Sequence, residues 1–253
     1  MLSRSRTTLA SIVTWGTLGL GVAVLFPVVL LWRVAGWPVD RWNYFGGRLF
    51  RGIAFAMRMV TPRWRFEVRG PRPADPRRPY VVVANHESFA DIILLSLLPW
   101  EMKWLSKASI MKIPVFGWTM WAVRDVPIHR GQSISAREAM DACRTRLAGR
   151  VSVMIFPEGT RSPRAEMLPF KDGAFRLALE AGVPILPLAL YGTRQAIAKH
   201  DWRISPAHAV VEILDPEPTA GLTLDDLDAL KARVRERIGA ARDRLKAELA
   251  AES

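Results

Sequence analysis

A run of 26 residues without a charged side chain, Thr7 to Trp32, constrains the fold more than any other feature. A helix needs about 20 apolar residues to cross the hydrocarbon core of a bilayer, so this run is long enough to span one. The core of a cleaved signal peptide is shorter, about 7–15 residues, and Trp32-Arg33 is a poor cleavage context. We therefore expect a retained membrane segment. Its glycines and Pro27 leave a spanning and a monotopic shape both open.

Residues 41–60 form a second apolar segment, which is amphipathic. At about 100° per residue, four arginines fall on one face of a helix and apolar side chains on the opposite face. These arginines are Arg41, Arg48, Arg51 and Arg58. We expect a helix in the headgroup plane, with its arginines facing lipid phosphate and a bend at Gly46-Gly47. The alternative is a surface helix packed on the globular part.

The distribution of charge agrees with a membrane partner. The chain has a net charge of +12, and residues 1–70 hold ten arginines against one aspartate and one glutamate. Half of the ten tryptophans lie in the same stretch, which is typical of contact with an anionic membrane surface. No zinc-finger, RNA-binding or basic-zipper pattern is present, so we expect no nucleic-acid partner. The single Cys143 excludes an internal disulfide, and we expect it to be buried in a helix.

From Pro62 onward, strand-like and helix-like segments alternate, which predicts an α/β domain. We expect domains at 1–61, a membrane-inserted and interfacial helix pair, and at 62–253, a mixed, largely parallel β-sheet flanked by helices. The expected strands are 64–68, 80–84, 103–106, 126–130, 151–156, 183–190 and 209–214. Two prolines make 183–190 an edge or irregular strand. Capping boxes predict helix starts at Ser135 and Thr223, and the last helix carries an amphipathic stripe to Leu249.

The segment Asn85 to Asp91 joins an expected buried strand to an expected buried helix. Residues five apart lie about 140° apart on a helix, so His86 and Asp91 meet only if His86 is in the loop. Ser88 is the expected N-cap, and Asp91 is then placed to accept the ring N–H of His86. That pair would suit a general base at the mouth of a pocket. The alternative is that Asp91 only caps the helix.

A second polar loop, Glu158-Gly159-Thr160-Arg161, follows another expected strand. Its glycine permits close backbone approach, its threonine offers a hydroxyl, and its arginine suits a phosphate. Lys107 and Arg130 also follow expected strands, and function in α/β sheets gathers where strands end. The alternative is that Glu158 and Arg161 pair with each other and shape a tight turn.

Four ordered segments resemble the motifs of the glycerolipid acyltransferase family, above all its bacterial 1-acylglycerol-3-phosphate acyltransferases. They are 85–91, with its His-x4-Asp pattern, 126–130, 156–162 with the run Phe-Pro-Glu-Gly-Thr-Arg-Ser, and 183–187. The resemblance covers about residues 80–190. The family usually carries Asp before the arginine of the second motif, and here His129 stands there. We interpret His129 as an ordinary surface substitution.

The resemblance implies an enzyme of phospholipid biosynthesis that acylates the sn-2 hydroxyl of lysophosphatidic acid and gives phosphatidic acid. His86 would be the general base and Asp91 would orient it. Arg130, Glu158, Gly159, Thr160 and Arg161, with Lys107, would hold the acceptor phosphate, and Pro184 would help shape the acyl site. Acyl-CoA or acyl carrier protein (ACP) would be the co-substrate, without a metal, a cofactor or a covalent acyl-enzyme.

The resemblance to bacterial members also implies a place at the inner membrane, with the catalytic domain facing the cytoplasm. Three other functions remain open from the residues alone. The acceptor could be another lysolipid, such as lyso-ornithine lipid. The chain could be a thioester hydrolase in which His86 activates water, or a non-catalytic protein that binds anionic membranes.

Overall fold

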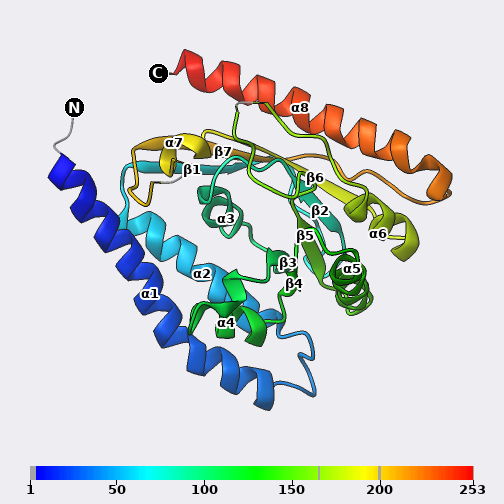
Figure 1. Ribbon diagram of the computed structural model, residues 1–253, viewed down its shortest axis with the longest axis horizontal. Coiled ribbons are helices and arrows are strands. Elements are labelled where there is room, and N and C mark those ends of the chain that lie inside the picture. The colour runs from blue at the N-terminus through cyan, green and yellow to red at the C-terminus, as the bar shows by residue number, and fades with distance from the viewer. Residues whose placement is uncertain (1–3, 165, 199–200, 253) are drawn as a thin grey trace.

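The protein, seen here as a computed structural model, is described over residues 4–164, 166–198 and 201–252. A central sheet has helices on both faces (Figure 1). Its strands are β1 (Trp64–Arg69), β2 (Val81–Ala84), β3 (Met102–Lys107), β4 (Val126–Ile128), β5 (Ser152–Ile155), β6 (Ile185–Tyr191) and β7 (Ala207–Ile213). The helices are α1 (Arg4–Ala35), α2 (Tyr44–Val60), α3 (Ala90–Leu95), α4 (Phe116–Ala122), α5 (Ser133–Ala148), α6 (Gly173–Ala181), α7 (Thr193–Ala196) and α8 (Leu227–Ala251). Two 3₁₀ turns, η1 (Ile110–Lys112) and η2 (Leu224–Asp226), complete the described elements.

The strand order is β1-β7-β6-β2-β5-β3-β4, and β6 with β7 is the antiparallel pair in an otherwise parallel described sheet. The mixed, largely parallel sheet is therefore confirmed. Along β2, Val82 and Ala84 join one core while Val81 and Val83 join the other. A strand that is covered on both faces needs apolar residues throughout, which explains its uninterrupted apolar run. The carboxyl ends of β2, β3, β4, β5 and β6 meet at one edge.

Strand β6 corrects the expectation that its prolines place it at an edge. It lies inside the sheet, between β2 and β7. Pro184 precedes the strand, and its carbonyl accepts the Val81 amide at 3.1 Å. Pro187 pairs with Val83 of β2, and the ladder to β7 begins only at Leu188. The Pro187 carbonyl accepts the amide of Leu214, just after β7, at 3.0 Å, so the N–H that Pro187 lacks falls where the ladder to β7 ends.

Helices α1 and α2 form an antiparallel hairpin (Figure 1). The hydroxyls of Thr14 and Thr61 lie 2.7 Å apart, and Asn43 donates to Val29 O at 3.4 Å near the turn. Asn43 is the N-cap, with a φ of 50°, so α2 begins at Tyr44 rather than at 41. The helix continues through Gly46-Gly47, which corrects the expected bend: a Cβ on Gly47 would lie 2.1 Å from Glu101 Oε1. Glycine here allows α2 to approach the domain closely.

The arginine face expected on α2 does not point to lipid as a whole. Arg51 is buried, and its guanidinium lies 2.5 Å from Asp125 Oδ1. Arg48 donates to the carbonyl of Leu98 at 2.6 Å, whereas Arg41 and Arg58 are exposed. The prediction of a lipid-facing Arg51 was wrong because Asp125, distant in sequence, provides a buried partner. The packed-helix alternative describes this helix better.

Helix α1 is one continuous helix across Pro27, and Thr7–Ala35 is long and apolar enough to cross a membrane. Little of it is buried inside the protein, and Leu9, Leu20, Val24 and Leu31 are exposed. This apolar surface indicates association with a membrane.

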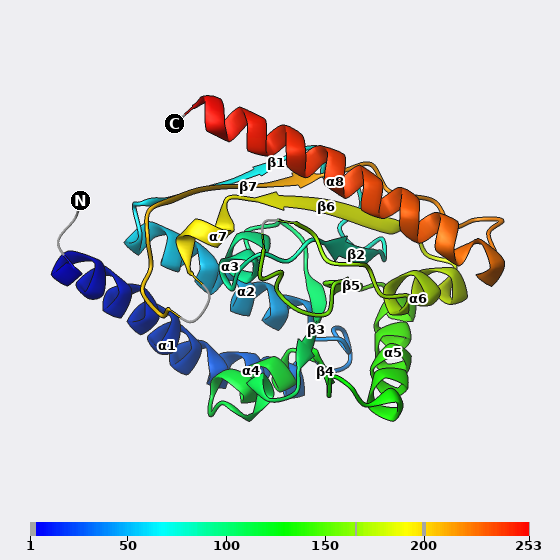
Figure 2. The same ribbon diagram turned by 45° about the horizontal axis from the view of Figure 1, so that its top comes forward.

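The opposite face of the sheet carries α5, α6 and α8 (Figure 2). The stripe on α8 from Leu227 to Leu249 is buried as predicted, and the capping box at Thr223 is present. The box at Ser135 is not: α5 begins at Ser133, and Ser135 Oγ accepts the amide of His129 instead. Cys143 is buried in α5, as expected.

Candidate active site

His86 lies in the loop between β2 and α3, where it contacts Asp91 on the first turn of α3. Its Nδ1 is 2.7 Å from Asp91 Oδ2, so the predicted contact is present. A carboxylate accepts, which assigns the ring proton to Nδ1. Nε2 then carries a lone pair, and it has no partner within the described part of the chain. The ring stacks on Phe156 with centroids 3.9 Å apart.

Asp91 is fully buried and accepts hydrogen bonds at both oxygens. Its Oδ2 also accepts the amides of Glu87 at 2.7 Å and Ser88 at 3.0 Å, and Oδ1 accepts the hydroxyl of Thr193. The regular helix begins at Ala90. The hydroxyl of Ser88 accepts the Ala90 amide at 3.3 Å, and Asp91 Oδ2 accepts the Ser88 amide, so the predicted cap contacts of Ser88 are present. Asp91 serves both the loop backbone and His86, so the capping alternative and the orienting interpretation are not exclusive.

Glu158 connects the two motif loops. Its Oε1 accepts the amide of His86 at 2.7 Å and its Oε2 that of Leu168 at 2.8 Å. Burial raises the pKa of Glu158, while these amides oppose the shift. Both oxygens are bonded to backbone, and a carboxylate would repel a phosphate. The expected phosphate contact of Glu158 does not fit this geometry, and neither does the alternative pair with Arg161.

The basic residues of the predicted site gather at the same edge of the sheet. Lys107 ends β3, and Arg130 follows β4. Burial and the charge of Arg161 lower the pKa of Arg130. The amide of Ser162, next to Arg161, donates to the carbonyl of His86 at 2.9 Å, so this loop lies beside the histidine. In the described ranges neither Arg130 nor Arg161 has a carboxylate partner. Two unneutralised guanidiniums beside a histidine suit a phosphate.

Of the remaining predicted residues, the structure agrees with the predictions for some and contradicts that for Pro184. Gly159 has a φ of +71° and Thr160 is exposed beside it, so the loop bends there as only glycine readily allows. Pro184 is a correction: β2 and β6 are parallel, and Val81 pairs with the residue after Pro184. Pro184 therefore lies at the far end of the strands from His86 and cannot shape an acyl site beside it. His129 is exposed, as expected.

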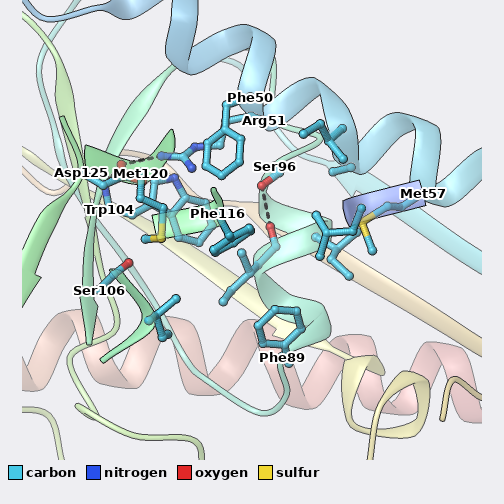
Figure 3. Close-up of a pocket in the computed structure, with 16 residues that line it drawn as sticks. Phe50, Arg51, Met57, Phe89, Ser96, Trp104, Ser106, Phe116, Met120 and Asp125 are labelled. Carbon is cyan, nitrogen blue, oxygen red and sulfur yellow. Dashed lines mark hydrogen bonds and ion pairs between the residues drawn. The ribbon is translucent and has the colours of Figure 1, made fainter. Parts of the chain in front are cut away.

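A narrow apolar pocket lies between α1, α2, α3 and α4 (Figure 3). Phe89, three residues after His86, is at one side, and the Arg51–Asp125 ion pair is at another (Figure 3). Trp104 also lines it and makes an edge contact with Phe156, the ring that stacks on His86. Aromatic side chains thus connect this pocket to the histidine.

Glu87 forms a buried ion pair with a distant helix. Its Oε1 lies 2.8 Å from Arg242 Nε, on α8. Burial and the charge of Asp91 raise the pKa of Glu87 to about 7, although Arg242 opposes the shift. This contact fixes the histidine loop against the opposite layer of the fold.

Sequence reasoning placed Asn85 and Phe156 in motif segments without giving them a role, and it missed Thr193. Asn85 exchanges two hydrogen bonds with the backbone of Leu190, at 2.8 and 2.9 Å, and so extends the pairing of β2 with β6. Thr193 had a signal, because it follows β6 at the edge where the other site residues lie. No group of three His, Cys, Asp or Glu side chains placed to hold a metal occurs in the residues described.

Comparison with known proteins agrees with this geometry. A family model described as Acyltransferase matches residues 65–191, half of the chain. The chain belongs to the acyltransferase family. Its fold is also that of a solved relative, the crystal structure of the 1-acyl-sn-glycerophosphate (LPA) acyltransferase PlsC from Thermotoga maritima. That match has a TM-score of 0.66 and 25% identity, and covers 90% of this chain and 96% of the other.

Curated relatives have similar names. Human 1-acyl-sn-glycerol-3-phosphate acyltransferase alpha is 38% identical over 173 residues, 68% of this chain and 61% of the relative. The human beta protein is 31% identical over 242 residues, 90% of this chain and 81% of the relative. The chain thus spans about three fifths of the alpha relative's length.

Proposed function

We propose that this protein transfers a fatty acyl group from a thioester to the sn-2 hydroxyl of lysophosphatidic acid and forms phosphatidic acid. The observation that carries this proposal is the His86–Asp91 pair, 2.7 Å apart, with the loop of Arg161 beside it: the Ser162 amide donates to the His86 carbonyl at 2.9 Å. The relatives from human and Thermotoga maritima are named for the same activity.

His86 Nε2 takes the proton from the acceptor hydroxyl as its oxygen attacks the thioester carbonyl. The carbon–sulfur bond then breaks, and the thiolate of CoA or ACP takes the proton back from the imidazolium. Asp91 stabilises the imidazolium at Nδ1. Arg130, Arg161 and Lys107 hold the phosphate of the acceptor, while Glu158 positions the His86 backbone rather than touching substrate.

The apolar pocket beside Phe89 takes the acyl chain of the donor. The Arg51–Asp125 ion pair lines one end of the pocket. The methyl end of an acyl chain is not stabilised by contact with charged groups, so the ion pair limits the length of chain that fits. Replacing Ser96, which lines the pocket, with phenylalanine should shift the donor preference toward shorter chains. A series of acyl thioesters of increasing length measures this shift, with Ser96→Ala as the control. An unchanged preference would place the acyl chain elsewhere.

The protein acts at a membrane, which holds the lysolipid acceptor and the hydrophobic face of α1. We place it at a bacterial cytoplasmic membrane, with the domain of 62–253 on the cytoplasmic side, where thioester donors are made. The basic charge of residues 1–70 supports contact with anionic lipid on that side.

The decisive experiment is an acyl-transfer assay that compares the full chain with His86→Ala. The variant should lose about 10²–10⁴-fold in rate, the usual contribution of a general base. Lysophosphatidic acid, lyso-ornithine lipid and a sample without acceptor form the panel. Transfer that survives in His86→Ala contradicts the base assignment, and thiol release without an acylated product favours a hydrolase.

A further inference from the structure

A cluster of arginines and tryptophans surrounds the turn between α1 and α2, far from His86. Its members are Arg33, Arg41, Arg124, Arg146, Trp37 and Trp42, here called the arginine–tryptophan cluster. The guanidinium carbons of Arg41, Arg124 and Arg146 lie 5.7, 5.6 and 5.3 Å from the Trp42 ring centroid. Arg41 and Arg124 also lie 5.6 and 4.8 Å from that of Trp37. Three guanidiniums thus lie within 6 Å of the centre of one indole ring, that of Trp42.

The positive charge of this cluster is poorly balanced. Asp40 is close enough to oppose it, but Asp40 already accepts the Trp32 indole N–H at 2.9 Å and the Tyr44 amide at 2.7 Å. Burial and the charges of Arg33, Arg146 and Arg41 lower the pKa of Arg124 to about 10. Like charges packed this closely repel one another, which indicates a site for an anion.

Two of the four arginines donate hydrogen bonds to backbone carbonyls, and the other two are available to bind an anion. Arg33 donates to the carbonyls of Trp121 and Ala122 at 3.1 and 3.0 Å, and Arg146 donates to that of Arg124 at 3.4 Å. The side chains of Arg41 and Arg124 make no hydrogen bond or ion pair among the described residues. The Nε of Arg124 is nevertheless buried without a partner, and its backbone has a φ of +66°, rare for a side chain of this size.

The surroundings of the cluster identify the source of the anion. Val34, Trp37 and Val39 are exposed beside it, at the end of the apolar surface of α1, and Trp121 of α4 is exposed under Arg33. A groove of about 440 Å³ opens next to Arg41 and Trp42; it also holds Asp40, Asp75 and Arg150, the last two paired with each other. Tryptophan and arginine at the end of a membrane helix favour the headgroup region.

We propose that the arginine–tryptophan cluster binds the headgroup phosphate of an anionic phospholipid at the membrane surface. Arg41 and Arg124 donate to the phosphate oxygens, and Trp37 and Trp42 contact the glycerol carbons. The site is separate from the acceptor phosphate at Arg161 and takes no part in acyl transfer. It rests only on the membrane association in the proposed function.

Binding to the detergent-purified full chain tests this site without an acyl donor. The probe is short-chain phosphatidylglycerol, titrated in neutral detergent and counted by native mass spectrometry. The double variant Arg41→Gln/Arg124→Gln should weaken binding by about tenfold or more, because two charge-assisted contacts are lost. The single variant Arg41→Gln should weaken lipid binding by a smaller factor. Arg41 is exposed and its side chain makes no hydrogen bond among the described residues, so this variant provides the test if the double variant does not fold.

Two control variants separate this site from net charge and from the active site. Arg176→Gln/Lys246→Gln removes the same charge from exposed positions on α6 and α8, across the sheet (Figure 2), and should bind as the wild type does. Arg161→Gln should also bind normally, even where acyl transfer fails. Equal losses in both double variants, or a loss in Arg161→Gln, would overturn the proposal. Competition by equal concentrations of inorganic phosphate would identify a free-phosphate site instead.

Discussion

Asp91 illustrates how single residues prepare this site before substrate arrives. A buried carboxylate that accepts four hydrogen bonds is held in one orientation. His86 is held on three sides, by Asp91 at Nδ1, by Glu158 at the backbone amide and by the Phe156 ring. The free Nε2 therefore has a defined direction, which is what general-base catalysis requires.

Glu87 predicts a measurable pH dependence of stability. Its pKa is about 7 in the folded protein against an ordinary 4.5, so the folded state keeps a proton that the unfolded state releases between these values. The stabilising contribution of Glu87 is full below pH 4.5 and is lost as the pH rises through 7. Glu87→Gln, which cannot titrate, should lack this decline.

Thermal unfolding of both proteins across this pH range measures the effect as a change in the difference between their Tm values. Glu236→Gln, at an exposed acid on α8, is the control and should follow the wild type. Tm curves for wild type and Glu87→Gln that run parallel throughout would contradict the raised pKa.

Helix α2 shows which part of an element a sequence can predict. Its periodicity correctly predicts a helix with an apolar face, because burial imposes that period. The partners of its arginine face are not local: Asp125 comes from after α4 and Glu101 from before β3. The local sequence pattern was enough to predict the alternation of strands and helices, the apolar stripe on α8 and the position of His86, Arg130 and Glu158 at strand ends. The Arg51–Asp125 and Glu87–Arg242 pairs needed the tertiary fold.

Gly47 and Gly52 provide a matched test of how α2 packs. A Cβ at Gly47 would lie 2.1 Å from Glu101 Oε1, whereas one at Gly52 meets nothing within 4 Å. Gly47→Ala should lower the free energy of unfolding by about 1–3 kcal/mol through overpacking. Gly52→Ala should raise it by up to about 1 kcal/mol through helix propensity. Denaturant unfolding in detergent measures both, and a neutral Gly47→Ala would mean that Glu101 moves freely.

At the scale of the whole molecule, the sheet separates two different surfaces. One face packs α1, α2, α3 and α4, which carry the exposed apolar surface and the pocket of Figure 3. The other packs α5, α6 and α8, which are amphipathic or polar outside. The α1–α2 hairpin is not a detachable anchor, because Phe50, Ile53 and Met57 of α2 belong to the core. Removal of residues 1–61 would therefore expose the apolar core of the domain to water as well as release the domain from the membrane.

Membrane association is better tested on the exposed side of α1. Leu20 and Val24 are 69% and 58% exposed and lie on one face. Leu20→Asp/Val24→Asp should release the protein from lipid vesicles, because each charge costs up to about 2.5–3.5 kcal/mol in the bilayer. Vesicle flotation measures the bound fraction. Ala232→Asp/Ala240→Asp adds the same charge to α8 and should float normally; flotation of the α1 variant would exclude this surface as the anchor.

The contact between Glu87 and Arg242 also has a consequence for the order of events during synthesis. Helix α1 precedes the domain in the chain and is therefore made before it. Arg242, which closes the histidine loop from α8, is translated 155 residues after its partner. The histidine loop therefore gains this contact only once the last helix has been made, when the apolar surface of α1 is already present.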